Sequence, residues 1–496
     1  MFVTARTMRD SFCAPAIKAA DVSDRDVPLC VDLDGTLVRT DMLVESWFAL
    51  LRRNALSALL APFWLCHGKA RLKHEIARRV DLDIRSLPYH GSFLDHLRKQ
   101  HSQGRRLVLA TATNEKYANQ VAQHLGIFES VIASDAQTNV SGAQKHRLLV
   151  EKFGASGFDY AGNARCDLPV CSSARQAILV NPEPGVARAA RKLADVAGSF
   201  SEPATLRAYL RALRPHQWLK NLLVFVPLMA AHRSGDATLL GHAALAFVAF
   251  GLCASSAYLV NDLMDLPADR AHARKRHRPF ASGEASVKVG LVLIPSLLLA
   301  SFGIAAWISA ALVAVLAVYF ASTLAYSLWL KGKVMADVLL LAALYTLRIL
   351  AGAAAVAIEL SFWLLAFSMF LFLSLAMVKR HAELLDLKNS GNASTQGRGY
   401  MVMDLATVQS QGAAAGYCAV LVLALYINSD DVRVNYAHPQ AIWLLCPLLL
   451  YWISRMWQKA GLGVMHDDPL IFALKDPVSR CVGVAGAIAV LAASWR

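Results

Sequence analysis

The sequence predicts a multidomain chain: an N-terminal α/β domain with a Rossmann-like parallel sheet, followed by an all-α transmembrane bundle. Of the 496 residues, 56% are hydrophobic and only 17% are charged, a balance that is typical of membrane proteins. The apolar excess begins near residue 215. Before that point the order strand, helix, strand repeats, which is typical of a parallel α/β sheet.

Residues 1–25 are expected to form an N-terminal tail. They mix basic residues such as Arg6 and Lys18 with several acids and contain no apolar core. A secretory signal peptide needs such a core, so we expect the following domain to stay in the cytoplasm. The nine cysteines lack metal-like or disulfide-like spacing, and the closest pair, Cys166 and Cys171, is expected to be reduced.

Residues 26–200 carry the polar signals of the α/β domain. An apolar strand runs into Asp32-Leu-Asp34-Gly-Thr, and two side chains that are two residues apart leave a strand on the same side. Both carboxylates can therefore reach one phosphate and one metal ion. The signals that follow, in chain order, are a strand ending at Thr111, then Lys145, and then Gly162-Asn163-Ala-Arg-Cys-Asp167.

Residues 201–217 are the expected link. Leucines recur between arginines from Leu206 to Arg214, and this pattern favours a helix that lies on anionic lipid. A plain charged linker is the alternative.

Nine apolar segments between residues 218 and 496 are candidate membrane spans, each close to the ~20 residues that a bilayer requires. Buried helices of a soluble protein would not recur in such a series. The segments are 218–233, 239–260, 287–308, 310–330, 335–357, 361–378, 412–428, 439–456 and 479–495.

The formal net charge of +14 comes from basic residues that gather in alternate loops rather than in one stripe. This distribution favours membrane orientation and phosphate binding, and we expect no nucleic-acid partner. With the N-terminus inside, the outer loops hold only Arg233 and Arg433, while loops with many basic residues, including Arg398, face the cytoplasm. We expect an integral protein of a bacterial inner membrane. The sequence predicts no oligomeric state.

An acidic motif follows the second apolar segment. Asp262, Asp265 and Asp269 fall on one face of a helix, and three carboxylates at the end of a span are costly unless they bind something. Carboxylates suit Mg²⁺, which usually bridges to substrate phosphates. The basic run Arg274–Arg278 lies directly behind and can grip phosphate. The motif therefore predicts a membrane enzyme that handles a diphosphate.

Five motifs in order, over residues 211–495, resemble the UbiA superfamily of intramembrane prenyltransferases. The resemblance is closest to its polyprenyl-phosphate phosphoribosyltransferase branch, because the loop that begins at Lys379 has mixed charge and lacks a second Asp-rich motif. The motifs are Leu213-Arg-Pro-His-Gln-Trp218-Leu-Lys220-Asn221, Asn261-Asp262-x-x-Asp265-x-x-x-Asp269, Arg276-x-Arg278-Pro279-x-x-x-Gly283, Tyr326-Ser-x-x-x-Lys331 and Tyr345-x-x-Arg348-x-x-x-Gly352.

This resemblance implies transfer of 5-phosphoribose from phosphoribosyl pyrophosphate to a polyprenyl phosphate lipid, with catalytic Asp262 and Asp265. Arg348 lies inside a predicted span, and its alternative partner, Asp337, lies about three turns earlier on that span, too far for direct contact. For Arg270, His272, Arg274 and Lys275, a role in membrane topology and lipid contact is an open alternative. The expected Mg²⁺ ligands are Asn261, Asp262, Asp265 and Asp269. The expected substrate-binding residues are Lys220, Asn221, Tyr258, Arg276, Arg278, Tyr326, Lys331, Arg348, Lys379, Arg380 and Glu383.

The N-terminal signals resemble the haloacid-dehalogenase (HAD) phosphohydrolases, with a helical cap near residues 41–85. The resemblance implies that Asp32 is the nucleophile, that Asp34 is the general acid/base, and that Thr111 and Lys145 hold the phosphoryl group. Mg²⁺ would bind Asp32, the Asp34 carbonyl and the fourth motif, which is Asn163 and Asp167 here. The family usually has Asp where this chain has Asn163, so a degenerate domain is the alternative to an active phosphatase.

The fusion suggests that the phosphohydrolase removes the 5-phosphate from the transferase product. A competing hypothesis is a prenyltransferase that moves a polyprenyl group from its pyrophosphate to an aromatic or tetrapyrrole acceptor. A transporter with a regulatory head is a third, disfavoured by the position of the acidic motif at a span end beside basic residues.

Overall fold

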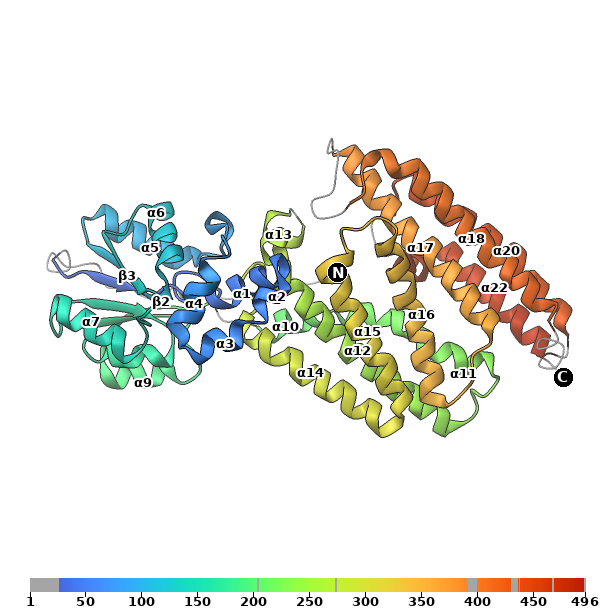
Figure 1. Ribbon diagram of the computed structural model, residues 1–496, viewed down its shortest axis with the longest axis horizontal. Helices are drawn as coiled ribbons and strands as arrows, with labels where there is room; N and C mark the ends of the chain where they lie inside the picture. Colours follow the sequence, from blue (N-terminus) through green and yellow to red (C-terminus); the bar gives the residue numbers. More distant parts are fainter. Residues whose placement is uncertain are drawn as a thin grey trace, which may run out of the picture. The chain divides into compact units, whose positions relative to one another are not determined.

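The computed structural model describes residues 26–202, 205–272, 274–390, 399–429, 436, 438–465 and 468–494. The expected tail, residues 1–25, and the loop residues Arg398 and Arg433 lie outside this part of the chain. The chain divides into two compact units (Figure 1). Unit 1 comprises Met1–Ala212 and Asp262–Val292, and unit 2 comprises Leu213–Asn261 and Leu293–Arg496.

The predicted parallel α/β sheet is confirmed in unit 1. Its six strands lie in the order β3-β2-β1-β4-β5-β6, and every neighbouring pair is parallel. Strand β1 lies between β2 and β4, so the loops at the carboxyl ends of these three strands meet at the place where α/β sheets bind ligands. The strands are β1 Leu29–Val31, β2 Leu107–Asn114, β3 Ser130–Ser134, β4 Asp159–Gly162, β5 Gln176–Val180 and β6 Asp195–Phe200.

Helices cover both faces of this sheet (Figure 1). Leu29 and Val31 belong to one buried cluster together with helices α5 (Gly91–Ser102) and α6 (Glu115–Leu125). Cys30, between them, faces the other cluster with α7 (Ala143–Phe153) and α8 (Leu168–Cys171). Both faces of a parallel strand are buried, which explains why the strands read as continuous apolar runs. Helix α9 (Val186–Leu193) leads into β6.

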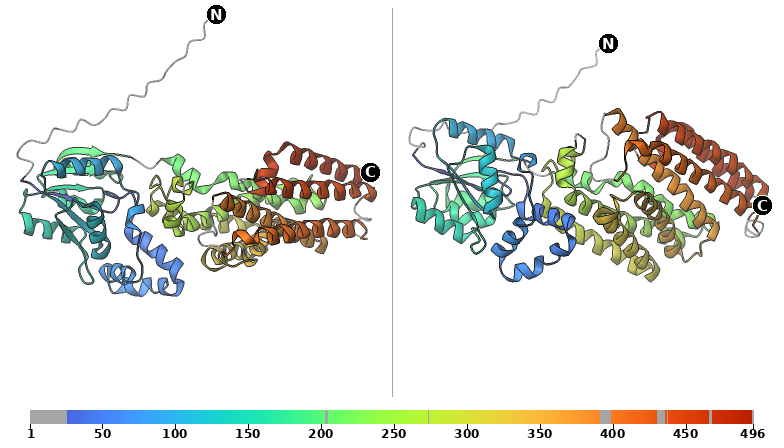
Figure 2. Two further views of the ribbon diagram at one scale, coloured as in Figure 1. Left: turned by 90° about the horizontal axis from the view of Figure 1, so that it is seen from above. Right: turned by 45° about the horizontal axis from the view of Figure 1, so that its top comes forward.

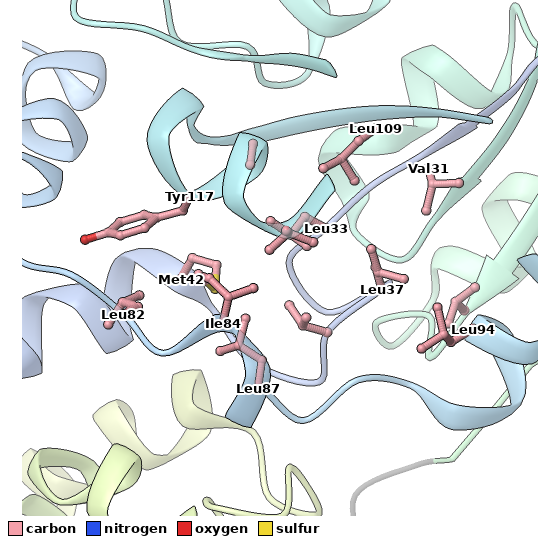
Figure 3. Packing of buried hydrophobic residues seen from close by; sticks show 14 of the residues in the cluster. Val31, Leu33, Leu37, Met42, Leu82, Ile84, Leu87, Leu94, Leu109 and Tyr117 are labelled. Carbon is pink, nitrogen blue, oxygen red and sulfur yellow. The ribbon is translucent and has the colours of Figure 1, made fainter. Parts of the chain in front are cut away.

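The predicted helical cap is confirmed by four helices between β1 and α5. The first of them begins where Asp41 accepts hydrogen bonds from the backbone N–H groups of Leu43 and Val44, an N-cap that satisfies free donors of the first turn. Figure 3 shows Met42, Leu82 and Ile84 in the same apolar cluster as Leu33, and this cluster joins the cap to the sheet. The cap helices are α1 Met42–Arg53, α2 Ala55–Ala58, α3 Ala61–Cys66 and α4 Lys69–Ala77.

Three smaller features complete unit 1. The amphipathic stretch of the link forms α10, Leu206–Leu213, and the segment after the acidic motif forms α13, Leu266–Ala271, and a 3₁₀ turn, Lys275–His277. Cys166 and Cys171 are free thiols, as predicted. The domain boundaries at residues 200 and 217 stay predictions.

Within the described residues, seven helices are long and apolar enough to cross a membrane, whereas we expected nine. Helices α17, α18 and α20 run beside one another in unit 2 (Figures 1 and 2). The seven candidate spans are α12 (Ala237–Met264), α14 (Val287–Ile308), Ala310–Leu330 (α15, Ala310–Ala325, with a π turn, Tyr326–Leu330), α16 (Ala336–Val356), α17 (Phe362–Asn389), Val402–Ile427 with α18 (Leu405–Ile427), and α22 (Pro477–Ser494).

The other two expected spans, 218–233 and 439–456, are interrupted. The first consists of a 3₁₀ helix, Pro215–Phe225, and the short α11, Val226–Ala230, with Pro227 near its start. The second consists of a 3₁₀ helix, Pro439–Leu444, and α20, Leu445–Gly461, while α21 (Pro469–Lys475) is shorter still. Proline supplies no N–H group and fixes its own φ angle, so it favours the first turn of a new helix over the interior of a long one.

Candidate active sites

The HAD motif residues of unit 1 come together around Lys145. Its buried Nζ donates hydrogen bonds to Asp32 Oδ1 at 2.8 Å and to Asp167 Oδ1 at 3.2 Å. Lys145 therefore joins the first and fourth motifs across 113 and 22 residues of chain. Burial raises the pKa of Asp32 to about 6, although the Lys145 ammonium opposes the shift. The Lys145 ammonium thus favours the ionised form of Asp32, which a nucleophilic carboxylate requires.

Asp34 lies in the loop that follows the same strand, β1. Its Oδ1 accepts a hydrogen bond from Met42 N at 2.9 Å, and its Oδ2 accepts one from the Thr113 hydroxyl. Burial, reinforced by Asp41, raises the pKa of Asp34 to about 7. A carboxyl group that exchanges its proton near neutral pH suits general acid/base chemistry. Thr111 is buried, and its hydroxyl oxygen accepts a hydrogen bond from Thr113 N at 3.0 Å.

The fourth motif has few free oxygen atoms with which to bind a metal ion. Asp167 Oδ1 binds Lys145 and Tyr160, and its Oδ2 accepts from the backbone N–H groups of Asn163 and Ala164. The Asn163 side chain packs against Gly35, where an added Cβ would lie 2.2 Å from Asn163 Nδ2. One charged ligand, Asp32, and neutral oxygens therefore remain, and this donor set fits a strongly bound Mg²⁺ poorly.

A lysine of the cap, Lys73, also reaches this site and was not predicted. Its Nζ on α4 donates to the Ala112 carbonyl at 2.5 Å and to Asn139 Oδ1 at 2.8 Å. Burial lowers the pKa of Lys73, while Asp34 and Asp41 oppose that shift. No local pattern singles this lysine out among the basic residues of the cap.

The acidic motif also lies in unit 1, where arginines hold it. Arg278 Nη1 lies 3.0 Å from Asp262 Oδ1 and 2.6 Å from Asp269 Oδ2. Arg52 Nη1, from the cap helix α1, lies 3.0 Å from Asp265 Oδ1. The sequence predicted that Arg278 grips phosphate, but no pattern in it indicated that Arg52 would reach the motif.

A buried ion pair joins the same two segments of unit 1. Arg270 donates to both carboxylate oxygens of Glu45, at 2.6 and 2.8 Å. Both side chains are almost fully buried, so Arg270 makes a protein contact rather than the lipid contact considered as its alternative. Glu45 also accepts a hydrogen bond from Thr40. Glu45 lies in α1, far from Arg270 along the chain, so the sequence did not predict that the two residues pair.

The acidic motif has the type of ligand that a hard divalent cation prefers, but its carboxylates do not form a complete site among the described residues. Two carboxylates, from Asp262 and Asp269, converge on one positive group, the Arg278 guanidinium, and oxygen donors of this kind are those that Mg²⁺ prefers. No three His, Cys, Asp or Glu side chains approach closely enough to hold a metal ion among the residues that the structure describes.

In unit 2, Lys220 is paired with a residue that the sequence did not indicate, Asp468. Lys220 Nζ lies 2.6 Å from Asp468 Oδ2, and the Tyr345 hydroxyl donates to the same carboxylate at 3.1 Å. Lys379 Nζ lies 3.8 Å from it. Asp468 is the N-cap residue of α21, and only its contacts in the structure indicate that it belongs to this site. The structure thus brings together Lys220 and Lys379, two of the expected substrate-binding residues.

Arg348 lies next to this group. Its Nε donates to Asn221 Oδ1 at 3.0 Å, and its guanidinium carbon lies 5.4 Å from the centroid of the Tyr345 ring. Asp337, the considered alternative partner, is instead paired with Arg380, which also binds Glu383. Arg380 is buried in these ion pairs, so its expected contact with substrate would require them to open.

The remaining expected residues lie in separate contacts. In unit 2, the Arg214 guanidinium lies 5.3 Å from the centroid of the Tyr258 ring, and Ser327 donates to Asn261 Oδ1 at 3.2 Å. Tyr326 begins the π turn, and Lys331 follows it. Arg276 lies exposed on the 3₁₀ turn of unit 1.

Comparison with known proteins gives two families. The UbiA prenyltransferase family matches residues 222–467, and the family of haloacid dehalogenase-like hydrolases matches residues 29–170. A solved structure of a UbiA homolog from Archaeoglobus fulgidus bound to GPP and Mg²⁺ matches 57% of this chain and 99% of that chain at 19% identity, with a TM-score of 0.45.

Three relatives match over most of their own length. A decaprenyl-phosphate phosphoribosyltransferase of Mycolicibacterium smegmatis is 41% identical over 56% of this chain and 89% of that protein. The nodulation protein NoeC of Azorhizobium caulinodans is 40% identical over 54% of this chain and 87% of that protein. An uncharacterized protein of Sinorhizobium fredii is 35% identical over 93% of this chain and 90% of its own length. The chain is therefore an integral membrane protein of the UbiA prenyltransferase family, with a haloacid dehalogenase-like hydrolase domain fused ahead of its transferase domain.

Proposed function

We propose that the membrane domain transfers 5-phosphoribose from phosphoribosyl pyrophosphate to a polyprenyl phosphate. The observation that carries this proposal is the 41% identity, over 89% of its length, to a decaprenyl-phosphate phosphoribosyltransferase. The mixed charge of the loop that begins at Lys379 supports the same branch of the family. We place the reaction on the cytoplasmic side of a bacterial inner membrane, because the basic loops favour that side.

The proposed transfer does not require a strong general base. A phosphate oxygen of the lipid attacks the anomeric carbon of the ribose while the bond from that carbon to the pyrophosphate breaks, and the electron pair leaves with the pyrophosphate. The attacking group is already an anion at neutral pH. Catalysis therefore rests on positioning and on stabilising negative charge.

Two groups of residues would supply that stabilisation. Lys220, Lys379 and Arg348 are cations held close to one another in unit 2, and they suit the binding of phosphate groups. Asp262, Asp265 and Asp269 would hold Mg²⁺, which neutralises charge on a pyrophosphate when it is bound. Arg278, which now pairs with two of these carboxylates, can bind a phosphate oxygen instead.

The test is transfer of labelled ribose phosphate into lipid. Membranes that contain the full chain receive labelled phosphoribosyl pyrophosphate and a polyprenyl phosphate, and label is expected in the organic phase. Asp262→Ala should remove most of the transfer, whereas Asp386→Ala, at an exposed carboxylate of α17, should not. Consumption of a prenyl pyrophosphate with an aromatic acceptor, without transfer of ribose phosphate, would instead support the competing prenyltransferase.

As a second activity, we propose that the hydrolase domain removes the 5-phosphate from the lipid product. The placement of Asp32, Asp34 and Lys145 at one strand end favours it. Asp32 would attack phosphorus and displace the ribose oxygen, which Asp34 would protonate. Asp34 would then take a proton from the water that hydrolyses the aspartyl-phosphate.

Release of inorganic phosphate from phosphoribosyl lipid tests this activity. The full chain should release phosphate, and Asp32→Asn should abolish release while transfer continues. Transfer without any phosphate release by the unaltered chain would contradict the second activity and leave the first intact.

A further inference from the structure

An apolar surface lies open on the cap of unit 1. It is formed by α2 and α3, residues 55–66, which we call the cap tip. A large exposed apolar patch on a soluble domain often marks a site that contacts another protein or a membrane. The exposed side chains of the cap tip are Leu56 at 78%, Leu59 at 71%, Leu60 at 49%, Phe63 at 62% and Leu65 at 48%.

The inner side of the cap tip is anchored, so these side chains are directed outward by the fold. Ala58 and Trp64 are buried against the rest of the cap. The Arg79 guanidinium lies 4.7 Å from the centroid of the Trp64 ring. Asn54 caps α2 by accepting a hydrogen bond from Ser57 N at 3.1 Å. The two short helices therefore present one apolar face to the surroundings and cannot bury it by turning over.

The sequence that contains and flanks the cap tip is basic. Residues 51–74 contain no Asp or Glu, and the next acid, Glu75, is buried beneath the arginines that pair with it. An apolar face bordered by cations matches the boundary between acyl chains and anionic headgroups. The exposed cations are Arg53, Lys69, Arg71 and Arg78.

Length and tethering specify the mode of contact. A helical segment of 12 residues measures about 18 Å, less than the ~30 Å of a bilayer core, so the cap tip can lie in the interface but cannot cross it. The same chain carries seven candidate membrane spans, so the cap tip is covalently tethered to a membrane domain. Such tethering converts a weak contact into an intramolecular one.

We propose that the cap tip docks on the surface of an anionic bilayer, with Leu56, Leu59 and Phe63 at the acyl boundary and the basic residues among the headgroups. Helix α4 follows the cap tip directly and carries Lys73, which reaches the Asp34 end of the sheet. Docking would therefore hold the hydrolase site at the level of a lipid-linked phosphate, a consequence that rests on the proposed second activity.

Fluorescence quenching in vesicles tests the docking without any enzyme assay. The full chain, with its nine cysteines replaced, receives one cysteine at Leu59→Cys or Phe63→Cys, and a matched control at the exposed Gln103→Cys of the same unit. Each carries an environment-sensitive dye and is reconstituted with phosphatidylglycerol and doxyl-labelled lipid. We expect quenching at 59 and 63 to exceed that at 103 by about threefold or more.

Two comparisons distinguish contact with anionic lipid from contact between two protein chains. Vesicles of neutral lipid alone should weaken quenching at 59 in the same protein preparation, and Lys69→Glu with Arg78→Glu should do so in anionic vesicles. Equal quenching at 59, 63 and 103 would overturn the proposal. A dye shielded at 59 without lipid quenching, with energy transfer between labelled copies, would also overturn it and assign the surface to contact between two chains.

Discussion

Arg52 Nη1 lies 3.0 Å from Asp265 Oδ1, so a cap helix of the hydrolase domain contacts the acidic motif assigned to the transferase. The Arg270–Glu45 ion pair joins the same two segments, and all four residues belong to unit 1. A shift of α1 would therefore change the charge around Asp265. The two proposed activities share a physical contact as well as a chain.

Removing the partner of Asp265 should strengthen metal binding. In Arg52→Ala, Asp265 loses a competing cation, so the Mg²⁺ concentration that gives half-maximal transfer should fall about two- to fivefold, as expected for a half-exposed ion pair. Arg98→Ala, at an exposed pair in α5, is the control. A Mg²⁺ requirement that is unchanged, or raised, would show that Arg52 does not compete for this carboxylate.

Breaking the buried pair should destabilise unit 1. Arg270→Met leaves the Glu45 carboxylate buried without its main cation, which should cost about 3–5 kcal/mol. The readout is the melting temperature of the hydrolase unit in the detergent-solubilised full chain. Arg274→Met, at an exposed position nearby, should leave the transition within about one degree. If both variants melt alike, lipid contact or topology is the better account of Arg270.

Local patterns were enough to predict the sheet and the motif residues that meet at the end of its first strand. Strand β1 is an apolar run that Asp32 and Asp34 follow, and Lys145 was predicted from the order of motifs. Distant ion pairs could not be predicted in this way. Lys220 and Asp468 are 248 residues apart, and Arg52 and Asp265 are 213 apart, so no spacing rule relates them. Two of the nine spans were predicted wrongly because hydropathy does not detect the helix breaks beside Pro227 and Pro439.

The stability of unit 1 should fall as the pH rises from about 4 to about 7. The pKa of Asp34 is about 7 in the folded state, above its ordinary value, so the folded state binds more protons than the unfolded state between about pH 4 and 7. Stability is therefore lost over that interval. Asp34→Asn removes the titrating group and should stabilise the unit by about 2–4 kcal/mol at pH 8, with little effect at pH 4. The measurement is the melting temperature of both proteins at pH 4 and pH 8. An equal change in melting temperature at the two pH values would contradict a raised pKa of Asp34.

Restoring the missing acid should strengthen the hydrolase metal site. Asn163→Asp is isosteric beside Gly35 and adds a charged oxygen ligand, so phosphatase activity at low Mg²⁺ should rise about tenfold or more. The readout is hydrolysis of a soluble aryl phosphate by the full chain. Asp32→Asn in the same background should abolish the gain. No change in Mg²⁺ dependence would mean that residue 163 is not a metal ligand in this chain.

Asp468 should matter to transfer although no motif contains it. Its carboxylate binds Lys220 at 2.6 Å and accepts a hydrogen bond from Tyr345, so it positions a cation proposed to bind phosphate. Asp468→Asn keeps the shape but loses the charge, and transfer to polyprenyl phosphate should fall about tenfold or more, mainly through KM. Asp404→Asn, at a helix start in the same unit, is the control. An Asp468→Glu variant that recovers activity would support positioning by charge, whereas a loss confined to protein yield would reduce Asp468 to a structural role.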